Sequence, residues 1–538
     1  MAFERSFSHR SRKRNPYKPV ISFRIDFLLI IFLISTAALM YVFFHFSTFV
    51  ISDEIRYAIG FKQLSLNFGQ PFNYEMSFAY YRALSPLISS LSTRDIAVFL
   101  NTISSIAGIL ILIPLFFLLR SLLNSRIAFW VGLFLIFTPG YWLLSRYGHP
   151  AMLSMLFFMS SMMFFNRAMS AKEKGKQIIA FCLAIVFALL AILMRADVLL
   201  WFIAPFGLAI YSSGKRTRVT LFFTLIFIFS SVCLYLIFRL FLFGDLISPS
   251  GGTVLFHLQH RLPSIIVVAK SIMKNLVLFA FSLLPLCLVC LFLSLIYLVR
   301  TKQWKILALI GLWGIPMLVF MPFLGMDFSR LSALSLAPAL LSIIYWIDKL
   351  VYNRNIKMLL PLALLVISHA SLFFIGPRIS TYYSFNVNFN NKPISSVPID
   401  FVFVDYHLRK EYLEAVSTEA HDVINETGRN IVIVTSDTHY PWYAFELLYE
   451  RKIENISLTG EDDDTAILLI QTPQNRFYFY LVNNWRIRSH ELTSFLDLEE
   501  IKNTKVHLDS FLLRPSPTKL FFEHDEVGKL LRNFCPSE

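Results

Sequence analysis

Residues 25–57 read IDFLLIIFLISTAALMYVFFHFSTFVISDEIRY, and the change of polarity in this stretch decides the fold. Positions 25–51 are almost entirely apolar, and a helix needs about 20 mostly apolar residues to cross a bilayer. Directly after them stand Ser52, Asp53, Glu54, Ile55, Arg56 and Tyr57. Two adjacent carboxylates at a membrane surface repel each other and are costly to desolvate, so the pair indicates a function. The alternative is the solvated first turn of a helix, where the helix dipole favours acidic residues.

The composition of the whole chain supports a membrane protein. The 538 residues are 56% hydrophobic and only 16% charged, and they include 55 Phe. Soluble globular proteins carry about 25% charged residues, and a nucleic-acid-binding protein becomes basic through dense Lys and Arg rather than through an apolar background. The apolar excess also excludes intrinsic disorder. We therefore predict a polytopic α-helical membrane protein that does not bind nucleic acid.

Eleven apolar stretches predict membrane spans, which backbone polarity forces to be helical in lipid. Residues 262–274 would add a partial or re-entrant helix, and the alternative to eleven spans is twelve or thirteen. The first stretch is too long for a signal peptide, so we interpret it as an uncleaved span. The predicted spans are 25–51, 96–119, 127–144, 149–165, 177–193, 197–212, 219–243, 275–299, 306–324, 331–348 and 358–375.

Charge divides the chain into two parts. Residues 1–375 hold 33 Lys and Arg against 11 Asp and Glu, whereas residues 376–538 hold 16 against 24. The net charge of +14 is thus the difference between a basic membrane region and an acidic C-terminal part. We predict a basic cytoplasmic N-terminus at 1–24, a transmembrane domain at 25–375 with a long outer loop at 52–95, and a soluble domain at 376–538.

The positive-inside rule orients the predicted spans. Basic residues fill the N-terminus and alternate short loops, so this side is predicted to be cytoplasmic. An odd number of spans then places the C-terminal domain outside the cytoplasm. The loops concerned contain Arg120 and Arg126; Arg167, Lys172, Lys174 and Lys176; Lys215, Arg216 and Arg218; Arg300, Lys302 and Lys305; and Lys349, Arg354 and Lys357.

The opposite, outer loops carry mixed polar residues, so a functional site is expected there. Arg56 and Arg82 lie in the loop 52–95, where they suit phosphate oxygens or, alternatively, snorkel at the interface. His149 precedes the fourth span, and either it contributes to a site or it is an interfacial polar residue. Arg195 and Asp197 separate the fifth and sixth spans, and the alternative for them is a local ion pair in a tight turn. Arg330 precedes the tenth span.

No residue pattern establishes a metal site. His257 and His260 are spaced to share a helix face but lack a carboxylate, and Glu461, Asp462, Asp463 and Asp464 form a solvated turn with a divalent cation as the lesser alternative. Cys287 and Cys290 have CxxC spacing within an apolar span, which favours buried core residues. The sequence therefore assigns no metal ligand and no certain cofactor, and a divalent metal stays open.

The C-terminal part has the pattern of a small α/β domain. After an Asn/Ser/Pro-rich linker at 376–400, helix-like runs at 405–426 and 441–450 alternate with strand-like runs at 431–435, 466–470 and 477–482. This alternation favours an α/β fold. Ser436, Asp437 and His439 follow the first of these strands at its carboxyl end, where sites of α/β folds tend to occur. Turn chemistry is the favoured explanation, and an enzymatic role is the lesser alternative.

The membrane region resembles the GT-C superfamily of membrane glycosyltransferases, especially the protein O-mannosyltransferases and the lipid A aminoarabinose transferases. The similarity rests on the acidic pair Asp53-Glu54 after the first span, on Arg195-Ala196-Asp197, and on Arg330 followed by Pro338. It covers about residues 20–375. Two features depart from the family pattern: His149 and Pro150 stand where many members have an acidic residue, and Arg82-Ala83-Leu84-Ser85-Pro86 replaces a Lys-Pro-Pro-like run.

The resemblance implies an inverting glycosyltransferase that takes a sugar from a polyprenyl-phosphate-linked donor at the outer face of the membrane. The acceptor would be an envelope lipid, glycan or protein. Asp53 would be the catalytic base, with Glu54 as the second candidate, and the other residues would bind the donor phosphate or substrate. That second group comprises Arg56, Tyr57, Arg82, His149, Arg195, Asp197 and Arg330.

Two other functions remain as alternatives. A transporter or lipid flippase is disfavoured because charged residues are scarce within the spans and no inverted repeat is visible. A polymer ligase of envelope glycolipid, or an assembly factor, is the other alternative. We expect a bacterial inner membrane with a periplasmic C-terminal domain, and the endoplasmic reticulum membrane is the second choice.

Overall fold

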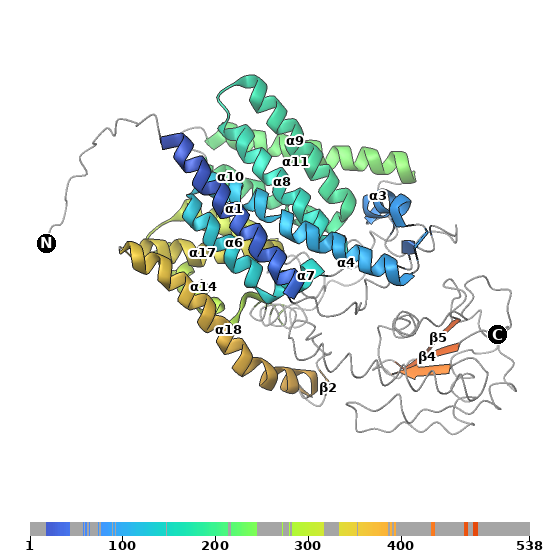
Figure 1. Cartoon of the computed structure of the whole chain (residues 1–538). Coiled ribbons are helices and arrows are strands. Elements are labelled where there is room, and N and C mark those ends of the chain that lie inside the picture. Colours follow the sequence, from blue (N-terminus) through green and yellow to red (C-terminus); the bar gives the residue numbers. More distant parts are fainter. Residues whose placement is uncertain are drawn as a thin grey trace, which may run out of the picture.

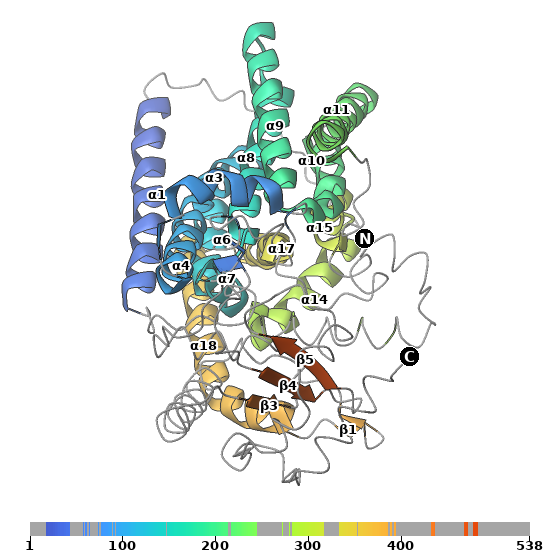
Figure 2. The ribbon, with the colours of Figure 1, turned by 90° about the vertical axis from the view of Figure 1, so that its right-hand side faces the viewer.

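The computed structural model describes residues 18–43, 57–146 with gaps, 148–212, 217–244, 269–316 with gaps and 333–393 with gaps, together with three strand segments. Figures 1 and 2 show a bundle of helices in which α1, α9 and α18 run in nearly the same direction. Helices up to residue 170 are α1 (Lys18–Phe43), α3 (Phe78–Ile88), α4 (Thr93–Leu110), α5 (Leu112–Leu122), α6 (Ser125–Phe137), α7 (Pro139–Arg146) and α8 (Ala151–Ser170). The later helices are α9 (Lys174–Met194), the 3₁₀ helix η2 (Ala196–Ile203), α10 (Ala204–Ser212), α11 (Thr217–Phe243), α14 (Pro285–Arg300), α15 (Trp304–Ile315), α17 (Ala333–Leu350) and α18 (Arg354–Phe385).

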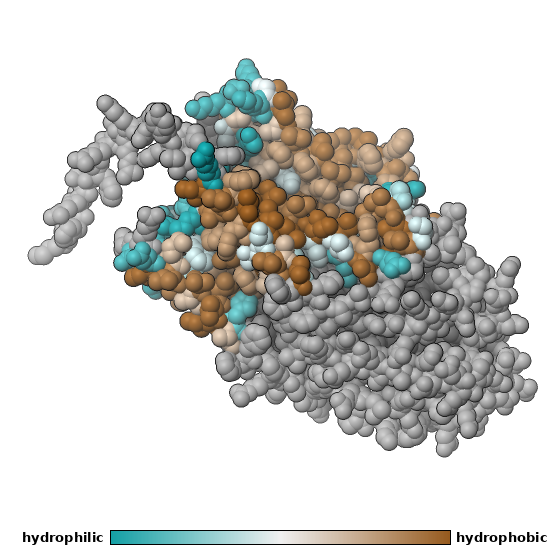
Figure 3. Space-filling model, in the orientation of Figure 1, coloured by the Kyte–Doolittle hydropathy of each residue, from teal (hydrophilic) through white to brown (hydrophobic). Residues whose placement is uncertain are grey.

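The helical part is that of a multi-pass membrane protein. Within the described residues, five helices are long and apolar enough to cross a bilayer: Arg24–Val42, Asp95–Leu122, Ala151–Ser170, Lys174–Met194 and Arg218–Phe243. Five shorter apolar helices accompany them. Figure 3 shows apolar residues in a broad band over the helices, with hydrophilic residues gathered near helix ends. Side chains such as Phe229 and Phe241 are 70% and 86% exposed, as lipid-facing residues are.

Helices α8 and α9 form the tightest pair because small and hydroxylated residues line their contact. The α9 side of the contact is a stripe of buried alanines, which lets the two backbones approach closely. On the α8 side, Ser154 donates to the carbonyl of Ala191 over 2.8 Å, and Ser161 donates to the carbonyl of Ala184 over 2.7 Å. These bonds, seven residues apart on each helix, fix the register of the pair. The alanines are Ala180, Ala184, Ala188 and Ala191.

Two predicted spans are interrupted by proline. The predicted span 127–144 divides into α6 and α7, because Thr138 before Pro139 is extended (ψ 126°), as the residue before a proline prefers. The hydroxyl of Thr138 satisfies the carbonyls of Phe134 and Leu135 over 2.8 and 2.7 Å. In the predicted span 275–299, α14 begins at Pro285, and Leu284 before it has a positive φ of 82°.

One end of the helical part is closed by ion pairs. Arg120 at the end of α5 pairs with Asp26 of α1 over 2.5 Å. Arg126 at the start of α6 pairs with Asp348 at the end of α17, and Lys357 of α18 lies 3.7 Å from the same carboxylate. These ion pairs thus join α1 to α5, and α6 to α17 and α18, on the side of the membrane that the charge pattern predicts to be cytoplasmic.

The opposite end of the α4–α5 span carries a second, smaller core. The predicted outer loop 52–95 contributes buried aromatic residues to this core, together with α3, the start of α4 and Met194 at the end of α9. Tyr57, Tyr80 and Tyr81 are at most 2% exposed. Within this predicted loop, Phe78–Ile88 form the helix α3. The helix α3 is short, with 11 residues, and Pro86 lies within its last turn.

The described part of the C-terminal region contains five strands. β1 (Asn388–Phe389) pairs antiparallel with β2 (Lys392–Pro393). β3 (Val432–Thr435) pairs parallel with β4 (Ile467–Gln471), which pairs antiparallel with β5 (Phe477–Leu481). All three strands predicted from apolar runs are therefore present. The start of the predicted linker 376–400 is helical instead, because α18 continues to Phe385. The predicted helices at 405–426 and 441–450 lie outside the described residues.

Candidate functional site

His149 stands at the start of α8, in the connection from α7. Pro150 is suited to the first turn of a helix because it has no N–H that needs an acceptor. The next N–H, that of Ala151, donates to Nδ1 of His149 over 3.1 Å. The imidazole therefore caps one of the backbone donors that every helix start leaves unsatisfied.

The backbone carbonyls of Gly148 and His149 accept hydrogen bonds from two other helices. The hydroxyl of Tyr80 on α3 donates to the carbonyl of Gly148 over 3.2 Å, and the hydroxyl of Ser104 on α4 donates to the carbonyl of His149 over 3.2 Å. Gly148 needs to be glycine, because a Cβ there would lie 2.8 Å from Oδ1 of Asn101 and 2.9 Å from Cβ of Leu100. His149 is thus held by its backbone as well as by its ring.

Arg195 and Asp197 form a buried ion pair where α9 ends and η2 begins. Arg195 is extended (φ −161°), and Asp197 lies in the first turn of η2, where the helix dipole favours a carboxylate. Nε of Arg195 lies 2.6 Å from Oδ1 and 2.7 Å from Oδ2 of Asp197. The Asp197 side chain is 1% exposed and the Arg195 side chain 15%. The expected local ion pair is therefore present.

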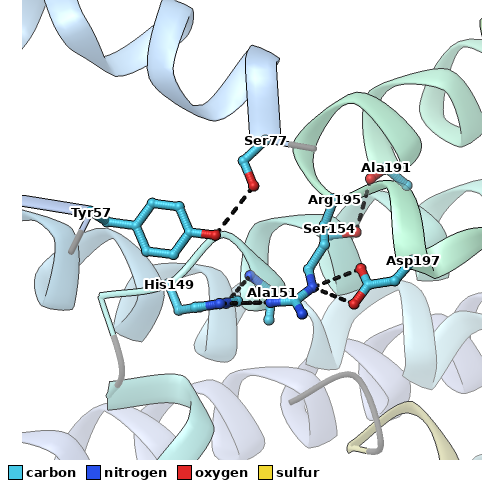
Figure 4. Close-up of polar contacts among 8 residues, drawn as sticks. All are labelled: Tyr57, Ser77, His149, Ala151, Ser154, Ala191, Arg195 and Asp197. Atoms are coloured by element: carbon cyan, nitrogen blue, oxygen red, sulfur yellow. Dashed lines mark hydrogen bonds and ion pairs between the residues drawn. The ribbon is translucent and has the colours of Figure 1, made fainter. Parts of the chain in front are cut away.

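The ion pair also reaches His149 from a different turn of the chain (Figure 4). Nη1 of Arg195 lies 2.6 Å from Nε2 and 3.0 Å from Nδ1 of the imidazole. Every hydrogen-bonding contact that these distances describe places an N–H donor against the ring. A neutral imidazole accepts at one nitrogen and carries N–H on the other, whereas an imidazolium accepts at neither. Only an unprotonated ring can therefore accept from Ala151 or from Arg195.

Tyr57 connects this cluster to the outer loop. Its ring meets the His149 ring edge to face at a centroid distance of 5.0 Å. Its hydroxyl lies 3.3 Å from Oγ of Ser77, and its ring also packs against Tyr80 and Tyr81. Tyr57 follows Asp53 and Glu54 in sequence by four and three residues, so the cluster anchors the chain close to the acidic motif.

The structure brings together four of the nine predicted site residues: Tyr57, His149, Arg195 and Asp197. They come from three segments that the sequence placed on the outer side, and we name them the outer cluster. Arg82 lies on the exposed face of α3, with its guanidinium 5.8 Å from the centre of the Phe78 ring. Asp53, Glu54, Arg56 and Arg330 lie outside the described residues.

Three supporting residues were not predicted from sequence. Ser77 and Tyr80 lie in the predicted outer loop, and Ser104 lies within a predicted span. A hydroxyl in a span is a weak signal, because serine often bonds within its own helix. Their role depends on which helices meet, and the sequence pattern does not contain that information.

The described residues do not form a metal site. No group of three or more His, Cys, Asp or Glu side chains in this part of the chain is arranged to hold a metal ion. In the outer cluster, both oxygens of Asp197 and both nitrogens of His149 already face Arg195. The weak metal signals at His257, His260 and 461–464 lie outside the described residues.

No protein-family model and no curated protein sequence matches the chain. Among solved structures, the fold is similar to that of ArnT from Cupriavidus metallidurans bound to undecaprenyl phosphate. The TM-score is 0.53 at 13% identity, and the match covers 82% of this chain and 92% of that chain. The apo structure of the same protein gives a TM-score of 0.49 at 14% identity with the same coverage. The chain therefore has an ArnT-like fold, which confirms at the level of fold the resemblance to the lipid A aminoarabinose transferases.

Proposed function

We propose that the chain is a glycosyltransferase of the GT-C type that uses a polyprenyl-phosphate-linked sugar as donor. The main support is the ArnT-like fold along 82% of the chain, because the matched structure holds undecaprenyl phosphate. The outer cluster adds a second argument. Residues from three separate predicted outer segments converge where α8 begins and α9 ends, and one of them, Tyr57, follows the acidic motif in sequence by three residues.

The proposed reaction is a displacement at the anomeric carbon of the donor sugar. An acceptor oxygen forms a new bond to this carbon while the bond from carbon to phosphate oxygen breaks, and polyprenyl phosphate leaves. The proton of an acceptor hydroxyl passes to a carboxylate, for which we assign Asp53, with Glu54 as the second candidate. Attack opposite the leaving group inverts the anomeric configuration.

Cationic groups are needed where the departing phosphate gains charge. We assign Arg56, Arg82 and Arg330 to this region. Arg195 is a further candidate. Its Nε already contacts Asp197 and its Nη1 contacts His149. Among the described residues, Nη2 is the nitrogen of this guanidinium left for a phosphate oxygen, and the contacts of Nε and Nη1 would fix its orientation for one charge-assisted hydrogen bond.

The acceptor is proposed to be an envelope lipid, glycan or protein on the outer face of a bacterial inner membrane. This proposal combines the expected topology with a donor that lies in the bilayer. The energy for transfer is stored in the activated donor, so the reaction requires no nucleotide. In agreement with this, the sequence contains neither a GxxxxGK[ST] run nor a GxGxxG run.

The test is Asp53→Asn in proteoliposomes supplied with undecaprenyl-phosphate-linked hexoses and pentoses. We expect a loss of transfer of at least about 100-fold, the scale of a missing general base, with unchanged expression and thermal stability. Glu173→Gln is the matched control, because Glu173 is an exposed acid at the opposite end of the bundle, paired only with Lys176 among the described residues. Near-normal turnover by Asp53→Asn contradicts the assignment. Movement of intact donor across the membrane without cleavage would instead support the flippase alternative.

A further inference from the structure

We propose that His149 is a positioning residue whose ring joins Tyr57 to the Arg195–Asp197 pair. The inference rests on the proposed function for its consequence in turnover, but its geometry stands on described residues alone. His149 is 3% exposed. One face of its ring meets Tyr57, and its nitrogens meet Arg195 and the N–H of Ala151.

The link from His149 to the reacting groups runs through the short chain between Tyr57 and Asp53. Four residues span at most about 14 Å when fully extended, so the position of Tyr57 limits where the Asp53 carboxylate can lie. Tyr57 is itself buried among Phe61, Tyr80 and Tyr81. A change at His149 should therefore affect the acidic motif through Tyr57 and the Arg195 guanidinium directly.

The connection requires an unprotonated ring. The structure places the Arg195 guanidinium, the Tyr57 ring and the Ala151 N–H against His149, and the Asp197 carboxylate contacts Arg195 from the opposite side. Protonation would place an imidazolium against the guanidinium and remove the acceptor for Ala151. Turnover should therefore be lost as the pH falls and His149 becomes charged.

The first experiment compares the wild type with His149→Ala, His149→Asn and His149→Gln in proteoliposomes. His149→Ala should lower kcat about 100-fold, the scale of a displacement of about 1 Å, with KM changed less than about threefold. Asn places an oxygen near the position of Nδ1 and Gln near that of Nε2, so both should recover part of kcat. Neither amide titrates, and the acid limb of the wild-type pH profile should therefore disappear in His149→Gln. An unchanged acid limb, or equal losses in all three variants, overturns the proposal.

The second experiment needs no turnover. Hydrogen exchange by mass spectrometry on the full chain in nanodiscs should show faster exchange in the peptide that contains Tyr57 for His149→Ala than for the wild type. The inner half of α8, around Phe165, is the internal reference and should not change. If the Tyr57 peptide exchanges at the wild-type rate, the positioning role is wrong. If the wild type transfers no sugar yet this peptide responds, the proposed function fails and the link between His149 and Tyr57 stands.

Discussion

At the scale of single residues, the Arg195–Asp197 pair shows what can be inferred locally. Two opposite charges separated by one residue predict an ion pair, and this prediction is confirmed by contacts of 2.6 and 2.7 Å. The third partner, His149, lies 46 residues away. Its contact with the pair depends on the antiparallel packing of α8 and α9, so the sequence alone identified His149 as a candidate site residue without joining it to this pair.

Removing Asp197 should destabilise the protein more than removing the whole pair. The Asp197→Ala variant leaves a guanidinium that is 15% exposed without its carboxylate, and breaking a buried pair from one side costs about 3 kcal/mol. The double variant Arg195→Met with Asp197→Leu leaves no buried charge and should unfold at a higher temperature than Asp197→Ala in detergent. As control, Glu173→Gln breaks an exposed pair with Lys176 and should cost less than about 0.5 kcal/mol. Equal melting temperatures for Asp197→Ala and the double variant would contradict this argument.

At the scale of elements, hydropathy located the helices but not their interruptions. Each of the eleven predicted spans coincides with at least one described helix. The predicted span 127–144 is broken at Thr138-Pro139, although the proline was visible in the sequence. A proline in a membrane helix is often tolerated when neighbouring groups satisfy the freed backbone, so its presence alone did not decide between a kink and a break. The hydroxyl of Thr138 and the packing of Gly140 against Ser282 accompany a break.

The contact between α10 and α15 provides a matched test of packing. A Cβ on Gly207 would lie 3.1 Å from the carbonyl oxygen of Ala308 and 3.1 Å from Cα of Leu309, both backbone atoms. Gly207→Ala should therefore force the two helices apart and destabilise the protein by about 1–3 kcal/mol. Gly311→Ala, on α15 itself, meets nothing within 4 Å and should be neutral or stabilising by up to about 1 kcal/mol. Thermal unfolding of both variants measures the difference, and a Gly207→Ala variant as stable as the wild type would show that the contact is looser than described.

At the scale of the whole molecule, two polar ends are separated by an apolar band (Figure 3). One end is closed by the ion pairs of Asp26, Arg120, Arg126, Asp348 and Lys357. The other holds the outer cluster, and the α4–α5 span connects the two. The grouping of these residues follows the loop charges, because a chain that crosses a bilayer repeatedly returns alternate loops to the same side. The helices of the membrane region could thus be predicted from hydropathy and charge, whereas in the C-terminal region the confirmed predictions are three separate strands.

The loop charges predict the orientation of the molecule in the membrane. Basic residues are retained in the cytoplasm, so the end with the Asp348 ion pairs should face the cytoplasm and the outer cluster the opposite compartment. Reporter fusions test this prediction. A green fluorescent protein fused after Lys172, between α8 and α9, should fluoresce, because that turn contains Lys172, Lys174 and Lys176. Alkaline phosphatase fused after Glu538 should be active, because an odd number of spans separates the two termini. A non-fluorescent fusion at Lys172 together with an active phosphatase at Glu538 would contradict the span parity. An inactive fusion at Glu538 with a fluorescent one at Lys172 would place the C-terminal part in the cytoplasm, and it would then have no access to the compartment that the outer cluster faces.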